Sequence, residues 1–195
     1  MKTIVSAGLA AAALLVGATF APAQAATRTD TFDPIGLFSE PSSAPPAATA
    51  IPREVVSLPG HHAAGTIIVS VSERRLYYVL GGGQAIRYGV GVGRPGFEWT
   101  GMKAVTRKAE WPAWTPPAQM LRRRPDLPRH MAGGPDNPLG ARAMYLGGSL
   151  YRIHGSNEPE SIGQAVSSGC IRMLNEDVVD LYERVRVGTR VLVMR

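Results

Sequence analysis

Hydrophobic side chains recur at every second position in three segments between residues 67 and 92. Their recurring positions are Ile67, Val69 and Val71, then Leu76, Tyr78 and Leu80, then Ile86, Tyr88, Val90 and Val92. A glycine triplet at residues 81–83 lies between the second and third segments. Period-two alternation around a glycine turn predicts antiparallel β-strands. Gly89, Gly91 and Gly93 in the third segment predict a bend or a close approach of another backbone.

The C-terminal part of the chain combines strand patterns with one helical pattern. Residues 144–146 and 150–153 predict two strands joined by a turn at Gly147–Gly148. The period then changes to that of a helix, with apolar side chains at Val178, Leu181, Tyr182 and Val185. We expect Asn175 to cap the start of this helix, and residues 190–194 to form a closing strand. The whole pattern predicts a mostly β domain with a flanking C-terminal helix.

A long insert rich in proline, glycine and tryptophan occupies residues 93–140. It contains the run Trp111–Pro117 and a second turn signal at Gly133–Pro135. A connection of this length in a small domain is typical of a functional loop or lid. A stiff surface excursion packed by its own tryptophans would give the same composition, and the sequence leaves both interpretations open.

The first 64 residues predict an export signal followed by a linker. Lys2 precedes an apolar stretch that ends in the small-x-small triplet Ala23–Ala25, so residues 1–25 are expected to form a signal peptide cleaved after Ala25 or Ala26. The alternative is an uncleaved membrane anchor, because residues 3–27 carry no charge. Scattered prolines predict a linker over residues 26–64 and leave residues 65–195 as the folded domain. We therefore expect an exported protein of the periplasm or cell wall.

Composition narrows the classes of function. With 195 residues, 45% of them hydrophobic, the chain suits one globular domain. The formal charge of +6 is a mild excess that favours an anionic polymer, but the basic residues are too scattered to predict nucleic-acid binding. A single cysteine excludes an intramolecular disulfide framework and a cysteine-rich zinc site. We expect no metal and no other cofactor.

The residues that could carry chemistry lie between positions 153 and 173. Cys170 follows a glycine shortly before the predicted helix, and His154 closes an apolar strand with fifteen residues between them. A cysteine nucleophile needs a neighbouring base to form its thiolate, and backbone N–H groups around Gly169 could stabilise an oxyanion. The alternative is that Cys170 is a small buried hydrophobe and His154 a structural residue.

The run His154-Gly155 followed by Ser167-Ser168-Gly169-Cys170-Ile171-Arg172 resembles the catalytic motif of the L,D-transpeptidase family of the YkuD/ErfK type. The resemblance covers about residues 65–195 and implies an L,D-transpeptidase-like β-sandwich or barrel with a flanking C-terminal helix and a long Pro/Trp-rich insert. Ser168 stands where the common motif has histidine, which removes a second candidate base. Residues 98–101 also depart from the usual Thr-Pro-Thr-Gly of this family.

The resemblance assigns a role to each residue of the motif. It makes Cys170 the nucleophile and His154 the general acid/base, oriented by the backbone carbonyl of Gly155. It makes the N–H groups of Ser168, Gly169 and Cys170 the oxyanion donors. Arg172 would hold the loop through a salt bridge or bind a substrate carboxylate, and both interpretations stay open.

The implied substrate is a peptidoglycan stem tetrapeptide. Cys170 would attack the carbonyl at the L-centre of its third residue, release D-alanine, and pass the acyl group to an amine on another stem as a 3–3 cross-link. The resemblance also implies that a carbapenem acylates Cys170. The enzyme would contribute to cell-wall organisation and cell shape.

Several alternatives remain at the level of sequence. Water as the acceptor would give an L,D-carboxypeptidase, and a lysine side chain would give an enzyme that anchors an outer-membrane lipoprotein. From another class, the domain could be an inactive wall-binding module. Sortases place their arginine well beyond the cysteine, and papain-like enzymes place cysteine before histidine, so the order of residues here argues against both.

Overall fold

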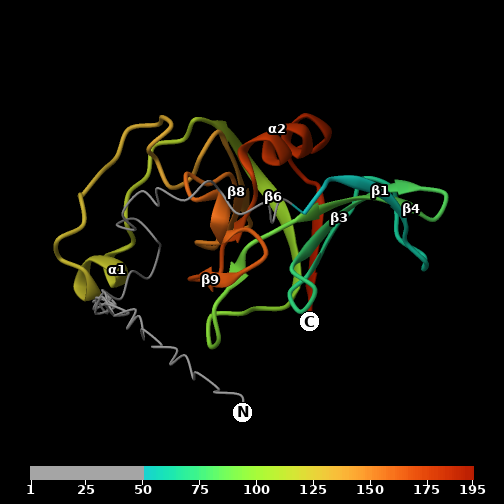
Figure 1. Cartoon of the computed structure of the whole chain (residues 1–195), viewed down its shortest axis with the longest axis horizontal. Helices are drawn as coiled ribbons and strands as arrows, with labels where there is room; N and C mark the ends of the chain where they lie inside the picture. The colour runs from blue at the N-terminus through green and yellow to red at the C-terminus, as the bar shows by residue number, and fades with distance from the viewer. Residues whose placement is uncertain (1–50) are drawn as a thin grey trace, which may run out of the picture. The chain divides into compact units, whose positions relative to one another are not determined.

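The computed structural model describes residues 51–195, and the predicted signal peptide and the first part of the predicted linker lie outside them. The described part is built mainly from strands (Figure 1). The strands are β1 (Glu54–Ser57), β2 (Ile67–Ser70), β3 (Arg75–Gly81), β4 (Gln84–Gly89), β5 (Val92–Gly93), β6 (Gly101–Glu110), β7 (Arg142–Leu146), β8 (Arg152–His154), β9 (Ala165–Ser167), β10 (Ile171–Arg172) and β11 (Arg190–Met194). The helices are α1 (Ala118–Arg123), α2 (Asn175–Arg184) and the short 3-10 turn Pro159–Ser161.

Nine strands form one sheet in the order β1-β4-β3-β2-β11-β6-β7-β8-β10, and β5 pairs separately with β9. The pairs β2–β11 and β8–β10 are parallel, and all other neighbours in the large sheet are antiparallel. All four residues of β2 are buried, which fits a strand in the middle of a covered sheet.

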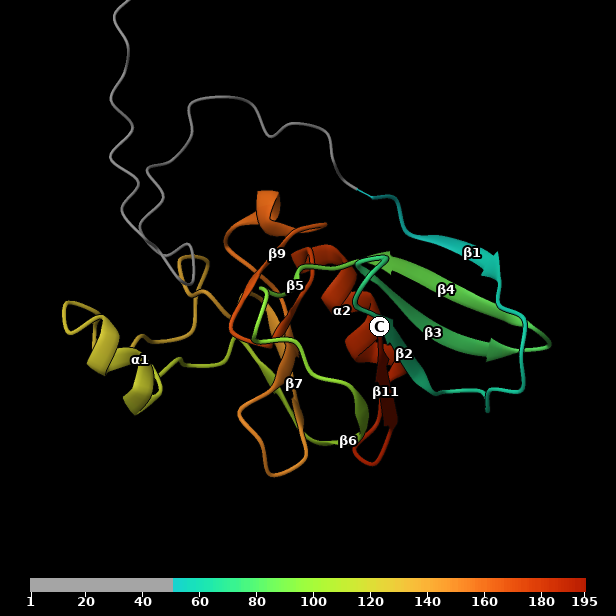
Figure 2. The same ribbon diagram turned by 90° about the horizontal axis from the view of Figure 1, so that it is seen from below.

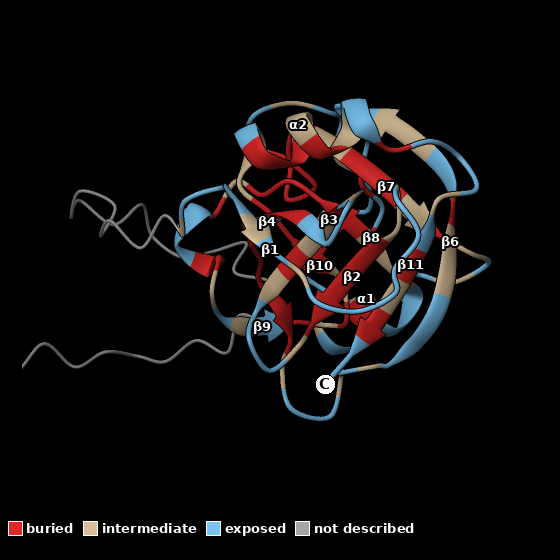
Figure 3. Cartoon of the chain, turned by 90° about the vertical axis from the view of Figure 1, so that its right-hand side faces the viewer, coloured by how far each residue is buried: buried red, intermediate tan, exposed pale blue. Residues whose placement is uncertain are grey.

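Strand β6 joins the two halves of the large sheet. Its first four residues pair with β11, and its last part pairs with β7 after a register shift between Val105 and Arg107. A bulge of this kind bends a strand and increases its twist. The main hydrophobic core draws residues from both halves of the sheet and from α2, and the buried segments gather between them in Figure 3.

Most of the predicted elements are confirmed. The alternating segments form β2, β3 and β4, the turn at Gly147–Gly148 connects β7 with β8, and the helix and closing strand are α2 and β11. A Cβ on Gly91 would lie 2.7 Å from the carbonyl oxygen of Ser161, which confirms the predicted close backbone approach. The mostly β class with a flanking C-terminal helix is therefore correct.

Two expectations about the elements are wrong. Residues 54–57 form β1, which pairs with β4 from Glu54↔Arg87 to Ser57↔Gln84, so this part of the predicted linker belongs to the sheet. This four-residue strand lies between Pro52 and Pro59, and the surrounding prolines led to the prediction of a linker. Residues 101–110 of the predicted insert form the long strand β6.

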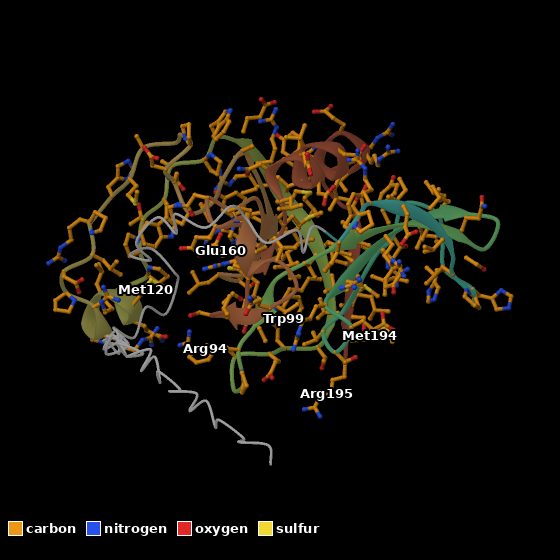
Figure 4. The ribbon with its side chains drawn as sticks, viewed as in Figure 1. Arg94, Trp99, Met120, Glu160, Met194 and Arg195 are labelled. Carbon is orange, nitrogen blue, oxygen red and sulfur yellow. The ribbon has the colours of Figure 1, made fainter. Side chains whose placement is uncertain are left out.

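The part of the insert after β6, residues 111–140, leads away from the sheet and carries α1 (Figures 1 and 2). Figure 4 places Met120 on this helix. Met120 packs with Trp114, Leu127 and Leu139 in a small second core. The insert therefore has a small apolar centre that includes Trp114, whereas Trp111 is exposed. Within residues 51–195, no helix is long and apolar enough to cross a membrane.

Candidate active site

The parallel pairing of β8 with β10 brings the motif residues together. Ile153 is paired with Ile171, and His154 with Arg172. Because side chains alternate between the two faces of a strand, one face sends the two isoleucines into the main core. The other face presents His154 and Arg172, which line a cleft together with Cys170. Local sequence and strand register thus place the predicted nucleophile and base in one cavity.

This cleft has a volume of about 360 Å³ and lies between the strand ends and the insert. Trp114, Pro117, Gln119, Met120 and Arg123 line it from the side of the insert. The insert therefore forms one wall of the site. The lining also includes Arg152 and Arg172 but no aspartate or glutamate of the described chain, so the cleft is electropositive.

His154 is buried at the end of β8 and is held in one orientation. Its Nδ1 lies 2.5 Å from the carbonyl oxygen of Gly155. Since a carbonyl can only accept, Nδ1 carries the proton and Nε2 is left as the basic nitrogen. Burial, reinforced by the positive charge of Arg172, lowers the pKa of the imidazole to about 3. The ring is therefore a neutral acceptor throughout the physiological range.

Cys170 is half-buried, and its Sγ lies 3.7 Å from the carbonyl oxygen of Leu150. Burial raises the pKa of the thiol, although the charge of Arg152 partly opposes this effect. The resting pair is thus a neutral thiol beside a neutral imidazole. A thiolate forms only when a base removes the proton, and His154 is the titratable base that lines the same cleft.

A tight turn positions the nucleophile. The hydroxyl of Ser167 donates to the carbonyl oxygen of Cys170 at 2.6 Å and accepts the N–H of Gly169 at 3.1 Å. Gly169 has a φ of +103°, and the indole of Trp99 donates to its carbonyl at 2.8 Å. Trp99 stacks on Tyr151 with ring centroids 4.7 Å apart. The turn is therefore fixed from both sides.

The hydrogen bond to Ser167 corrects the expected set of oxyanion donors. The N–H of Gly169 is already used inside the turn, so it is not a donor to the cleft in this conformation. Among residues 51–195, no partner is recorded for the N–H groups of Ser168 and Cys170. These two groups remain as candidate oxyanion donors.

Arg172 forms a buried ion pair with Glu158. Its Nη1 lies 2.7 Å from Oε2 of the carboxylate, and both side chains are at most 10% exposed. Glu158 follows the strand that carries His154, and Arg172 follows Cys170, so the pair links the segments that carry His154 and Cys170. This contact favours the loop-holding interpretation of Arg172 over a substrate carboxylate.

We expect Glu158→Gln to lower the free energy of unfolding by about 3 kcal/mol, because it leaves the buried charge of Arg172 without its carboxylate partner. Glu110→Gln is a matched control, since Glu110 pairs with Arg142 at 3.2 Å but is 60% exposed. The control should cost less than about 1 kcal/mol. Urea unfolding of both variants measures the difference. Equal, small losses would contradict the loop-holding role.

Asn175 has a different role from the predicted cap. Leu174 is the N-cap residue of α2, and no side chain caps the helix. The amide of Asn175 instead accepts the N–H of Ala141 at 2.9 Å and donates to the carbonyl of Ser156 at 3.0 Å. A Cβ on Gly155 would lie 2.2 Å from its Oδ1. Asn175 therefore braces the segment after His154, and only glycine fits beside it.

Several residues of the site could not be predicted from the sequence. Trp99 is far from the motif in sequence, Glu158 lies in an irregular segment, and Tyr151 and Arg152 lie just before His154 without belonging to the motif. The weak exception is Arg152, which stands two positions before His154 on the same strand face. Period-two alternation would have placed it on the side of the cleft.

Known proteins are similar to this chain in sequence. Residues 64–193 match the family model described as L,D-transpeptidase catalytic domain, YkuD. The probable L,D-transpeptidase ErfK/SrfK of Escherichia coli strain K12 is 40% identical over 153 residues, covering 74% of this chain and 48% of that protein. The probable L,D-transpeptidase YbiS of the same organism is 41% identical over 149 residues, covering 72% and 47%. The chain thus spans about half the length of the curated relatives it matches.

A solved structure extends the likeness to the fold. L,D-transpeptidase 3 of Mycobacterium tuberculosis superposes with a TM-score of 0.54 over 68% of this chain and 60% of that chain, at 18% identity. At this identity the superposition shows a shared fold. The family itself follows from the model that matches residues 64–193 and from the relatives at about 40% identity. This chain belongs to the family of the YkuD-type L,D-transpeptidase catalytic domain.

Proposed function

We propose that this protein is a peptidoglycan L,D-transpeptidase that uses Cys170 as its nucleophile and His154 as its general acid/base. The observation that carries the proposal is one cleft holding a free thiol and a neutral imidazole, whose Nδ1 is fixed by the carbonyl of Gly155. Family membership supports the reaction type, and the electropositive lining supports a peptide substrate with carboxylates.

In the first half-reaction, Sγ of Cys170 attacks the carbonyl carbon at the L-centre of the third stem residue. Nε2 of His154 takes the thiol proton as the S–C bond forms. The oxyanion is stabilised by the N–H groups of Ser168 and Cys170. The C–N bond then breaks, the imidazolium returns the proton to the departing amine of D-alanine, and a thioester remains on the enzyme.

In the second half-reaction, an amine attacks the thioester carbon. His154 accepts a proton from the attacking nitrogen and returns it to the sulfur, so the thiol is regenerated and a new amide bond forms. Transfer to an amine rather than to water requires an oriented acceptor and limited solvent. The insert supports this selectivity because Trp114, Pro117 and Met120 supply an apolar wall to the cleft.

The acceptor in this proposal is the side-chain amine of diaminopimelate on a second stem, which gives a 3–3 cross-link. A lysine of an outer-membrane lipoprotein and water remain alternative acceptors for the same thioester.

The export signal expected at residues 1–25 would bring the enzyme to the periplasm or cell wall. Solved members of this fold include one from Mycobacterium tuberculosis with a faropenem-derived adduct, and we propose that carbapenems acylate Cys170 in the same way.

Mass spectrometry of the products tests the proposed reaction. The chain is incubated with a disaccharide-tetrapeptide that carries diaminopimelate, and the expected products are free D-alanine and a cross-linked dimer. Free D-alanine with monomeric tripeptide would mean that water is the acceptor. Unchanged tetrapeptide, from a preparation that is folded and has a reactive thiol, would contradict the proposal and leave the wall-binding module.

A further inference from the structure

Arg152 differs from the other arginines of the cleft. It lies on β8 two residues before His154, so the pleat presents both side chains to the same side. Extending the β8–β10 register by one residue from Ile153↔Ile171 places Arg152 opposite Cys170. Its positive charge lowers the pKa of the Cys170 thiol, which agrees with a position beside Sγ. Arg152 is thus the arginine that lies directly opposite the nucleophile Cys170 in the register of β8 and β10.

The hydrogen-bonding capacity of Arg152 is not used up within residues 51–195. Its Nε is buried and has no hydrogen-bond partner, and no carboxylate of the described chain lies within ion-pair distance of its guanidinium. Its Cζ lies 5.3 Å from the centroid of the Tyr145 ring, and its side chain also forms a hydrogen bond with the Cys170 thiol, so Nε is the donor that remains without a partner. A buried donor without a partner costs free energy. A ligand that supplies an acceptor to this Nε–H removes that cost and therefore binds more tightly.

We propose that Arg152 binds the free C-terminal carboxylate of the residue that is released from the donor peptide. This inference rests on the proposed function, because it concerns the leaving group of that reaction. The guanidinium can offer its Nε–H and one Nη–H side by side, which matches the two oxygens of a carboxylate. Arg152 would then be a substrate-binding residue that selects peptides ending at the leaving amino acid.

The chemistry of the leaving group places its carboxylate close to Cys170. The bond that breaks joins the attacked carbonyl carbon to the amine of the leaving residue. The carboxylate carbon of that residue is two bonds from the amine nitrogen, so its binding partner must lie beside Sγ and His154. Arg172 is engaged by Glu158, and Arg123 lies on α1 in the insert, where it is exposed. Arg152 is therefore the arginine placed for this carboxylate.

The test compares two donor peptides that differ only at the C-terminus. One ends in D-alanine with a free carboxylate, and the other ends in D-alaninamide. The measured quantity is the ratio of kcat/KM for the acid to kcat/KM for the amide. For the unmutated chain we expect a ratio of about 10 to 100, the range of a charge-assisted hydrogen bond. Arg152→Gln should bring the ratio close to one, and Arg152→Lys should leave an intermediate value.

The ratio separates this role from a general effect on the nucleophile. Because Arg152 also lowers the pKa of the Cys170 thiol, its replacement is expected to slow both peptides alike. Only a fall in the ratio of kcat/KM for the acid to kcat/KM for the amide reports on carboxylate binding. Arg107→Gln is the matched control, since Arg107 also lies over the Tyr145 ring, at 3.6 Å, but does not line the cleft. It should keep both the rate and the ratio of the unmutated chain.

Two results would overturn the inference while leaving the proposed function intact. The unmutated chain could release both leaving groups with a ratio near one, or Arg152→Gln and Arg152→Lys could slow both peptides and keep the original ratio. The second result would assign Arg152 to the thiolate or to folding alone. Failure of the unmutated chain to release either leaving group would instead overturn the proposed function, and the inference with it.

Discussion

Cys170→Ala is expected to reduce the release of D-alanine by at least about 10⁴-fold, because no other group can form the thioester. The chain contains one cysteine, so no second thiol can replace it. The fold should survive the change. Sγ is half-buried and its recorded hydrogen-bond contact is a long one, 3.7 Å to the carbonyl of Leu150. The mass-spectrometric assay of D-alanine and dimer measures the loss.

Two controls separate lost chemistry from lost structure in this variant. Urea unfolding should give a free energy within about 1 kcal/mol of the unmutated chain. Iodoacetamide should add once to the unmutated chain and not at all to Cys170→Ala. Retained release of D-alanine by a folded Cys170→Ala chain would disprove the assigned nucleophile. It would also remove the basis for carbapenem acylation at this position.

The elements that could be predicted from the sequence are those whose pattern of apolar residues lies within one continuous segment. Alternation of apolar residues predicted β2, β3 and β4, and helical spacing predicted α2, because each pattern lies within one continuous segment. β6 was missed because its sequence, Gly-Met-Lys-Ala-Val-Thr-Arg-Lys-Ala-Glu, has one fully buried residue, Val105, and otherwise exposed or half-buried positions. Its place in the sheet comes from pairing with β11 and β7 at once, which is a tertiary property.

The same distinction applies to the candidate site. His154 and Cys170 were predicted from their motif, but the residues that orient them were not. Glu158 holds the guanidinium of Arg172 in an ion pair, and the hydroxyl of Ser167 accepts the N–H of Gly169. Each of these contacts joins the end of a two- or three-residue strand to an irregular segment, and strands this short show no periodic pattern. The motif was therefore recognisable in the sequence, whereas its geometry required the fold.

Burial and the neighbouring arginines together determine the protonation states of His154 and Cys170. Burial raises the pKa of Cys170 and lowers that of His154, and the neighbouring arginines reinforce the second effect. A resting thiolate–imidazolium pair is consequently disfavoured. In the proposed reaction, proton transfer therefore occurs during attack on the substrate, when the oxyanion and the carboxylates of the peptide bring negative charge into the cleft.

His154→Gln should lower kcat/KM for D-alanine release by about 10²- to 10⁴-fold, the usual contribution of a general base. Glutamine keeps much of the volume and polarity of the ring, but it cannot take a proton near neutral pH. The variant should remain folded. If His154→Gln kept the activity of the unmutated chain, another group would have to be the base.

The pH profile of the unmutated chain gives a second, independent test of His154. With a pKa of about 3, the imidazole is still neutral at pH 5, whereas a histidine with the usual pKa near 6.5 would be almost fully protonated. The acidic limb of kcat/KM should therefore lie well below pH 6.

The same lowered pKa links protonation of His154 to folding. The stability that the folded chain gains from keeping this imidazole neutral is fully present above about pH 6.5 and is lost as the pH falls toward 3. Circular dichroism at each pH must therefore accompany the rates. An acidic limb centred near 6.5 in a folded chain would show that the imidazole titrates as if exposed, and the neutral pair derived from the burial of the site would be wrong.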